Sequence, residues 1–272
     1  MKARIIAALL PLALVGAVAP QAAMADEHEA TVQVLHAVPG LTVDVYANGE
    51  ELLTDFAPGT LTDPVMLPAG SYDLKVTAVD AGPDGDAAIE ANDVTVPGGA
   101  NITVVAHLDA DGNPTLTPFV NDVAATAAGQ GRLTVRHTAA APAVDVRANE
   151  TVAFSNLSNP NEAKADLAAG TVSADVVLAG TSDVAIGPAD VNVAEGANTI
   201  VYAWGSAADG NLALAVQVID GLHSAPHGVP GGTGGQAAVA GNTSTALAVV
   251  AAGLLAAGLV VVASRRRAEL AE

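Results

Sequence analysis

An internal repeat is the feature that most limits what this chain can fold into. The segment 32–49, VQVLHAVPGLTVDVYANG, returns about 101 positions later, so that Val34, His36 and Val43 correspond to Val135, His137 and Val144. The further matches are Asp44, Val45, Ala47 and Asn48 with Asp145, Val146, Ala148 and Asn149. A repeat of this length predicts two copies of one small domain.

The repeated segments have the sequence pattern of β-strands. Residues 31–37 and 41–47 are alternating runs rich in β-branched side chains, and Asn48-Gly49 is typical of a type I′ hairpin turn. Further runs predict about seven strands in the first copy, at 52–56, 73–79, 88–96, 101–108 and 115–120, and no helix. The segment Leu67–Tyr72 is expected to be a turn. These patterns predict an all-β chain of two tandem antiparallel β-sandwiches, of immunoglobulin or transthyretin type.

The boundaries of the predicted regions follow from shifts in composition. A signal peptide is expected because Lys2 and Arg4 precede an apolar run and Ala23-Met24-Ala25 is a typical cleavage site. The apolar stretch near the other end is long enough for a transmembrane helix and is followed by Arg265–Arg267, which predicts that this end is cytoplasmic. The predicted regions are a signal peptide at 1–25, sandwiches at 31–122 and 132–221, a Gly/Pro-rich stalk at 222–244, the helix at 245–264 and a cytoplasmic tail at 265–272.

Charge and composition exclude several classes of function. The chain has 29 acidic and 10 basic residues, and the imbalance is greater between positions 26 and 244, where 27 acidic residues face five basic ones. Such a chain repels phosphate backbones, so nucleic acid is not expected as a partner. There is no cysteine, which excludes disulfides and thiolate metal sites. No cofactor is expected.

Two motifs in the first copy resemble a known family. They read His36-Ala37-Val38-Pro39 followed by Val43-Asp44-Val45-Tyr46, and later Leu67-Pro68-Ala69-Gly70-Ser71-Tyr72. The pattern is similar to that of bacterial proteins with tandem copies of the domain of unknown function 4397. The second copy departs from it, with Arg147 in place of the tyrosine and Ala168 in place of the proline. The resemblance implies an exported, often surface-attached, β-rich protein and brings no assigned activity.

The repeated histidine and aspartate are the first candidate site. His36 and Asp44 recur as His137 and Asp145, and a hydrogen-bonded pair of this kind could act in binding or acid/base catalysis. The favoured interpretation is structural, since buried polar groups need hydrogen bonds and no third polar residue accompanies the pair in both copies to form a triad. From the alternation of side chains, we expect His36 to lean inward and Asp44 to point away from the neighbouring valines.

A second candidate is the acidic segment 109–113. Asp109, Asp111 and Asn113 have the alternating oxygen ligands of a calcium loop. The glutamate that would complete an EF-hand is missing, and Asp-Gly-Asn is also ordinary hairpin-turn chemistry. The favoured interpretation is a turn, so no metal is predicted.

The sequence therefore predicts a non-enzymatic, single-pass protein of the cell membrane, held there by the C-terminal helix. The bulk of the chain would lie outside and serve in binding or adhesion. Its expected partner is an envelope polymer or another surface protein. Two alternatives stay open: an extracellular hydrolase or sensor that uses the His–Asp pair, and a calcium-stabilised adhesin.

Overall fold

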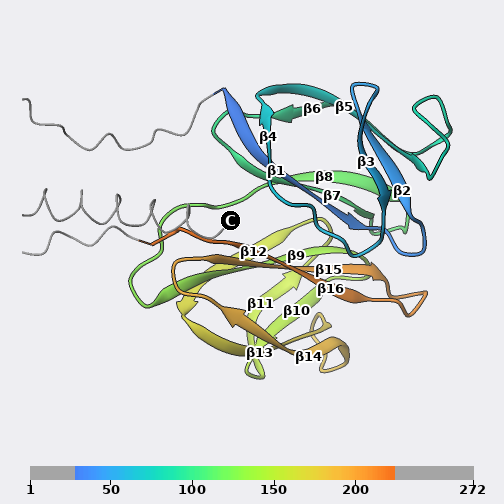
Figure 1. Cartoon of the computed structure of the whole chain (residues 1–272). Coiled ribbons are helices and arrows are strands. Elements are labelled where there is room, and N and C mark those ends of the chain that lie inside the picture. Colours follow the sequence, from blue (N-terminus) through green and yellow to red (C-terminus); the bar gives the residue numbers. More distant parts are fainter. Residues whose placement is uncertain (1–27, 224–272) are drawn as a thin grey trace, which may run out of the picture. The chain divides into compact units, whose positions relative to one another are not determined.

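The computed structural model describes residues 28–223, which contain sixteen strands and no helix (Figure 1). The first eight are β1 (Glu29–Ala37), β2 (Val43–Ala47), β3 (Glu50–Phe56), β4 (Val65–Pro68), β5 (Gly70–Ala78), β6 (Ala87–Val96), β7 (Asn101–Leu108) and β8 (Pro114–Val120). The other eight are β9 (Gln130–Ala140), β10 (Val144–Ala148), β11 (Thr151–Leu157), β12 (Glu162–Ala168), β13 (Gly170–Leu178), β14 (Val184–Val193), β15 (Asn198–Ser206) and β16 (Ala213–Ile219). The all-β prediction is confirmed.

Each group of eight strands forms two four-stranded sheets with the same strand order. The order is β4-β1-β7-β8 and β3-β2-β5-β6 in the first group, and β12-β9-β15-β16 and β11-β10-β13-β14 in the second. We call the groups the first and second sandwich, the sheets with β1 or β9 the central sheets, and the sheets with β2 or β10 the outer sheets. The identical order gives the sequence repeat a structural counterpart.

The core of each sandwich lies between its central and its outer sheet. In the first sandwich, Ala106 of β7 packs with Val43 and Val76 of the outer sheet. In the second, Val135 and Val201 belong to one cluster with Val146 and other outer-sheet valines. The face-to-face packing of two sheets over an aliphatic core is the arrangement of a β-sandwich.

The central sheets are mixed, so the expectation of purely antiparallel sheets is wrong. Strand β1 pairs in parallel with β7, with Val34 opposite Val104, and β9 pairs in parallel with β15, with Val135 opposite Val201. Parallel neighbours need a long crossover between them. The strands from β2 to β6, and from β10 to β14, provide that crossover.

A strand lies where the sequence predicted a turn. Strand β4 pairs only with β1, with Val65 opposite Val32 and Leu67 opposite Ala30. It is a short edge strand preceded by Pro64 and ending at Pro68, and proline is tolerated at sheet edges because one side of the strand needs no ladder hydrogen bonds. Its counterpart β12 pairs with β9 along seven residues.

The two central sheets also pack on each other. Leu35, Val105 and Phe119 of the first sandwich form one buried cluster with Ile200 and Tyr202 of the second. Strands β1, β7, β9 and β15 are therefore covered on both faces, and their residues are almost continuously buried. The two sandwiches belong to one compact unit.

Several predicted regions lie outside the described residues. These are the signal peptide, the stalk beyond His223, the transmembrane helix at 245–264 and the tail at 265–272. Between residues 28 and 223, no helix has the length and apolar character needed to cross a membrane.

Candidate functional site

The repeated histidines are buried and bonded to backbone groups. His36 Nε2 lies 2.7 Å from the carbonyl oxygen of Leu41, and its Nδ1 faces the amide of Val38 at 3.5 Å. His137 repeats the arrangement, with Nε2 3.0 Å from the carbonyl oxygen of Pro142 and Nδ1 3.4 Å from the Ala139 amide. A neutral ring that carries its proton on Nε2 satisfies both contacts. Each histidine thus ties the end of its strand to the following loop.

The repeated aspartates hold two other segments in place. The Asp44 carboxylate accepts hydrogen bonds from the backbone amides of Asp55 and Asp80, both at 3.0 Å. Asp145 accepts the equivalent bonds from Asn156 and Gly180, at 2.7 and 2.9 Å. These two bonds hold the pKa of Asp145 below its ordinary value, because they favour the charged form. Each aspartate therefore links its strand to the end of one hairpin and to the turn after another.

The histidine and the aspartate of one copy do not form a hydrogen-bonded pair with each other. His36 is 1 % exposed and packs against the ring of Phe56, with 5.6 Å between centroids. Burial lowers the pKa of His36 and of His137, with the backbone bonds opposing it. In both copies the histidine and the aspartate bond to backbone groups instead of to each other.

The acidic segment after β7 forms a turn closed by its own carboxylate. Asp109 Oδ1 accepts the backbone amides of Asp111 and Asn113 at 2.9 and 2.8 Å, and Oδ2 accepts the Asn113 side-chain amide at 3.2 Å. The bonds from Asn113 are the main reason that the pKa of Asp109 lies below its usual range. Among residues 28–223, no group of three or more histidine or acidic side chains is placed to hold a metal ion.

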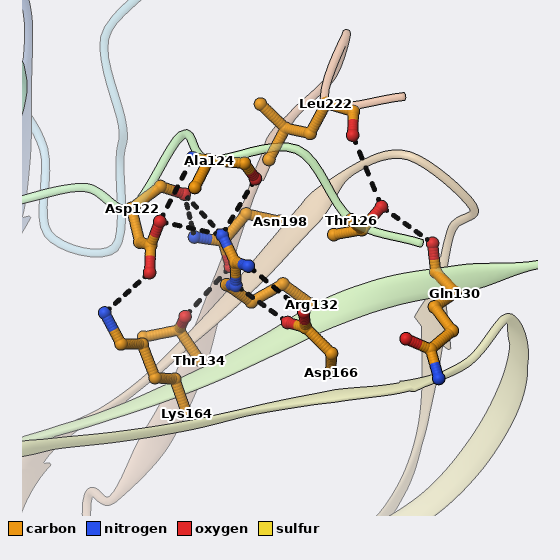
Figure 2. Close-up of polar contacts among 10 residues, drawn as sticks. All are labelled: Asp122, Ala124, Thr126, Gln130, Arg132, Thr134, Lys164, Asp166, Asn198 and Leu222. Atoms are coloured by element: carbon orange, nitrogen blue, oxygen red, sulfur yellow. Dashed lines mark hydrogen bonds and ion pairs between the residues drawn. The ribbon is translucent and has the colours of Figure 1, made fainter. Parts of the chain in front are cut away.

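Arg132 organises the segment between the two sandwiches, a role that the sequence did not indicate (Figure 2). Its guanidinium donates to Asp166 and to the Asp122 carboxylate, both at 2.8 Å, and to the Ala124 carbonyl oxygen at 3.1 Å. Lys164 reaches the second oxygen of Asp122 at 2.7 Å, and this bond is the main cause of the lowered pKa of Asp122. The linker is therefore held by charge-assisted hydrogen bonds rather than left free.

Arg136 is a second buried cation, and it lies where the central sheets meet. It is 1 % exposed, it pairs with Glu162 at 2.8 Å, and its guanidinium carbon lies 4.4 Å from the ring centroid of Phe119. The guanidinium also donates to the Tyr202 hydroxyl at 2.8 Å. That hydroxyl donates to Gln217, whose amide reaches Gln33 of the first sandwich. The positive charge is thus satisfied inside the contact between the sandwiches.

The first sandwich also has an apolar opening at the edge between its sheets. A cavity of about 40 Å³ lies in its core, and an adjoining crevice of about 60 Å³ lies between β3 and β4. The two spaces share Val32, Val34, Leu52 and Leu67 in their walls. Leu52 and Val65 at the crevice are 37 % and 46 % exposed. We call the space between β3 and β4 the edge crevice; its lining is Val32, Val34, Leu52, Leu53, Thr62, Val65 and Leu67.

A bulge in β3 directs two leucines to the edge crevice. The register shifts between Val45 opposite Leu53 and Tyr46 opposite Glu51, which leaves Leu52 as the extra residue. The second sandwich has the same bulge in β11, where the extra residue is Ala153. An alternating, half-buried strand would expose Leu52 and bury Leu53, so the pattern of β3 gave no sign that both line one space.

The corresponding edge strand of the second sandwich, β12, has charges on the face that it shares with Arg132 and Arg136 of β9. Strand β12 has Glu162, Lys164 and Asp166 at alternate positions, and all three make ion pairs, with Arg136, Asp122 and Arg132 respectively. The strand registers match Val65 and Leu67 of β4 with Ala165 and Leu167 of β12, which alternate with these charges. The two copies therefore share a strand order, but the second has a smaller apolar side chain where the first has Val65.

Comparison with known proteins gives one family and no activity. A domain of unknown function, DUF4397, is found at residues 30–147, a range that begins in β1 and ends in β10. No curated protein matches the chain. The matched range contains the first sandwich from the second residue of β1 onward and, with β9, the strand that brings Arg136 onto Phe119.

Proposed function

We propose that this chain is a non-enzymatic binding protein of the cell envelope. It displays two tandem sandwiches outside the membrane, anchored by the predicted helix at 245–264 after removal of the signal peptide at 1–25. The partner is another surface protein or an envelope polymer, and the binding is adhesive rather than catalytic. Of the two predicted sandwich types, we keep the transthyretin type, because each copy has eight strands in two sheets of four.

The observation on which the proposal depends is the edge crevice of the first sandwich. Exposed apolar side chains gathered at a cavity mark interaction sites more often than isolated surface leucines do. Leu52 and Val65 are exposed beside a space lined by aliphatic side chains. The second sandwich has the small residues Ala153 and Ala165 at the positions that match Leu52 and Val65, which supports a specific use of the first edge.

The contacts of the candidate residues count against the two alternatives, a hydrolase or sensor and a calcium-stabilised adhesin. A hydrolase or sensor needs a histidine that reaches solvent, whereas both ring nitrogens of His36 and His137 face backbone groups in buried positions. A calcium adhesin needs free carboxylate oxygens at 109–113, whereas both oxygens of Asp109 already accept hydrogen bonds within the turn.

Protease treatment of intact cells tests the display. Added protease should remove the region from residue 26 to about 240 and leave a small membrane-embedded fragment ending in the cytoplasmic tail. Lysed cells provide the control for access, and a cytoplasmic protein should survive in the intact sample. Full protection of the region in intact cells would contradict the proposed orientation.

A further inference from the structure

We infer that the edge crevice binds a protein segment that presents one apolar side chain between basic residues. The inference rests on the proposed function and specifies its partner. It has two parts, an apolar recess that accepts the side chain and an acidic surround that selects the charge of the flanking residues.

The edge crevice has room for a single aliphatic or aromatic side chain. Its volume of about 60 Å³ is that of part of one side chain, and the adjoining cavity of about 40 Å³ adds depth behind the shared wall. The walls of the inner cavity expose no polar surface. An apolar group is favoured there because it leaves water without leaving any buried hydrogen-bonding group unpaired.

Acidic residues stand close in sequence to Leu52 and to Val65 at the opening. Exposed Glu50 stands two residues before Leu52, and exposed Asp63 stands two residues before Val65. In the strand register, Glu50 lies opposite Ala47, whose side chain lines the inner cavity, so Glu50 is on the crevice side of β3. Between residues 28 and 120 the sequence has fourteen acidic residues and one lysine or arginine, Lys75. This charge attracts a cationic segment and repels an acidic one.

The short length of β4 favours insertion of a side chain over addition of a strand. Strand β4 has only four residues, Val65–Pro68, and prolines stand at its last position and directly before it. Proline cannot donate a ladder hydrogen bond and commonly protects sheet edges from further pairing. The partner segment is therefore expected to gain its affinity from the recess and the charges.

Fluorescence anisotropy of a labelled hexapeptide tests the inference on the full chain in nanodiscs of zwitterionic lipid. The probe is Lys-Lys-Leu-Ser-Lys-Lys, compared with Glu-Glu-Leu-Ser-Glu-Glu and with Lys-Lys-Ser-Ser-Lys-Lys. We expect saturable binding of the first peptide that weakens as salt is raised. Binding of the other two should be at least tenfold weaker.

Variants locate the site. Leu52→Lys and Val65→Lys should each weaken binding of the basic apolar peptide about tenfold or more. Ala153→Lys, at the same bulge position of the second sandwich, should leave binding unchanged. The double variant Glu50→Gln, Asp63→Asn keeps the shape of the opening, so it should weaken binding and reduce its salt dependence. Circular dichroism of each variant should match the parent chain.

Other outcomes would overturn the inference. If the Leu52→Lys chain bound the basic apolar peptide as tightly as the parent chain does, the peptide would bind at another site. If the Lys-Lys-Ser-Ser-Lys-Lys peptide bound as tightly as the basic apolar peptide, the acidic surface alone would explain the binding. Equal binding of the acidic peptide, or no saturable binding of the basic one, would be equally decisive. The peptide assay does not depend on membrane topology, so protection from protease would refute the display while leaving this result standing.

Discussion

Three buried histidines favour the folded state only while their rings are neutral. His36, His107 and His137 are each at most 1 % exposed, and His107 bonds Thr117 and the Leu108 carbonyl oxygen through its two ring nitrogens. Burial is the largest cause of the lowered pKa in each, and for His107 the nearby His137 lowers it further. The fold is therefore built around neutral imidazole rings.

Stability should fall as the pH drops below about 6.5, the ordinary pKa of histidine. Because the folded pKa values lie below the unfolded ones, the unfolded chain binds more protons in this range and is favoured. The loss begins near the unfolded pKa and levels off below the folded values. Urea midpoints at pH 7.5, 6.5 and 5.5 should decrease in that order.

A non-titrating variant provides the control for this pH dependence. In His137→Gln the side-chain amide can still donate to the Pro142 carbonyl oxygen, so the midpoint should depend less on pH between 7.5 and 5.5. Carboxylates with lowered pKa values, such as Asp145, lose their contribution only in a more acid range, below about 3.8. A midpoint that stays constant from pH 7.5 to 5.5 would contradict the expected role of the rings.

At the scale of strands, sequence patterns were informative where local chemistry decides the structure. The hairpin signal Asn48-Gly49 lies at the β2–β3 turn, with positive φ at both residues. Strand β12 was not recognised, because Glu162–Ala168 alternates charged residues with alanines and becomes a strand only by pairing with β9. The contact between the sandwiches was also missed, although the nearly continuous apolar run of β7 is typical of a strand covered on both faces.

The candidate site was predictable only in part. The inward lean of His36 followed from its alternation with Val34, but the recurrence of His36 and Asp44 did not show that each bonds to backbone groups. The edge crevice depends on the bulge at Leu52 and on the missed strand β4, and the role of Arg132 depends on partners at 122 and 166. Such contacts bring together positions that are far apart in sequence and that no local pattern relates.

Removal of Arg132 should cost far more than removal of Lys164. Arg132→Ala deletes a guanidinium that is 8 % exposed and leaves Asp122 and Asp166 without their shared partner. Since both carboxylates are partly in water, we expect a loss of about 1–3 kcal/mol in the free energy of unfolding. Lys164→Ala removes an ammonium that is 46 % exposed, and about 0–1 kcal/mol should be lost. Urea unfolding measures both, and equal losses would mean that the buried guanidinium does not fix the linker.

At the scale of the described molecule, the two sandwiches form one structural unit. The apolar cluster around Leu35 and Tyr202 is shared by both, and so is the polar chain from Gln33 through Gln217 to Arg136. Thr103 of β7 also donates to Gln217, at 3.0 Å. Each central sheet therefore has one face covered by residues of the other sandwich.

Calorimetry of the full chain should therefore show one cooperative transition for both sandwiches. In Leu35→Asp a charge is buried at the shared face without a partner, so two separate transitions are expected. Leu41→Asp is the matched control, because that leucine is 40 % exposed and its chain should keep a single transition. Two resolved transitions in the parent chain would show that the sandwiches melt independently.

The bond between Gln33 and Gln217 joins residues 184 positions apart. In a chain threaded across a membrane from its N-terminus, as we propose, β1 emerges long before β7 and β16. Strand β1 therefore cannot pair with β7, and Gln33 cannot bond to Gln217, until those residues have emerged. Contacts so distant in sequence slow folding because long loops have to close first. Until β7 emerges, the edge of β1 opposite β4 has no partner strand, and an unpaired edge of a hydrophobic strand is the kind of surface that aggregates. The same contacts that unite the finished molecule thus make its nascent chain dependent on protection during export.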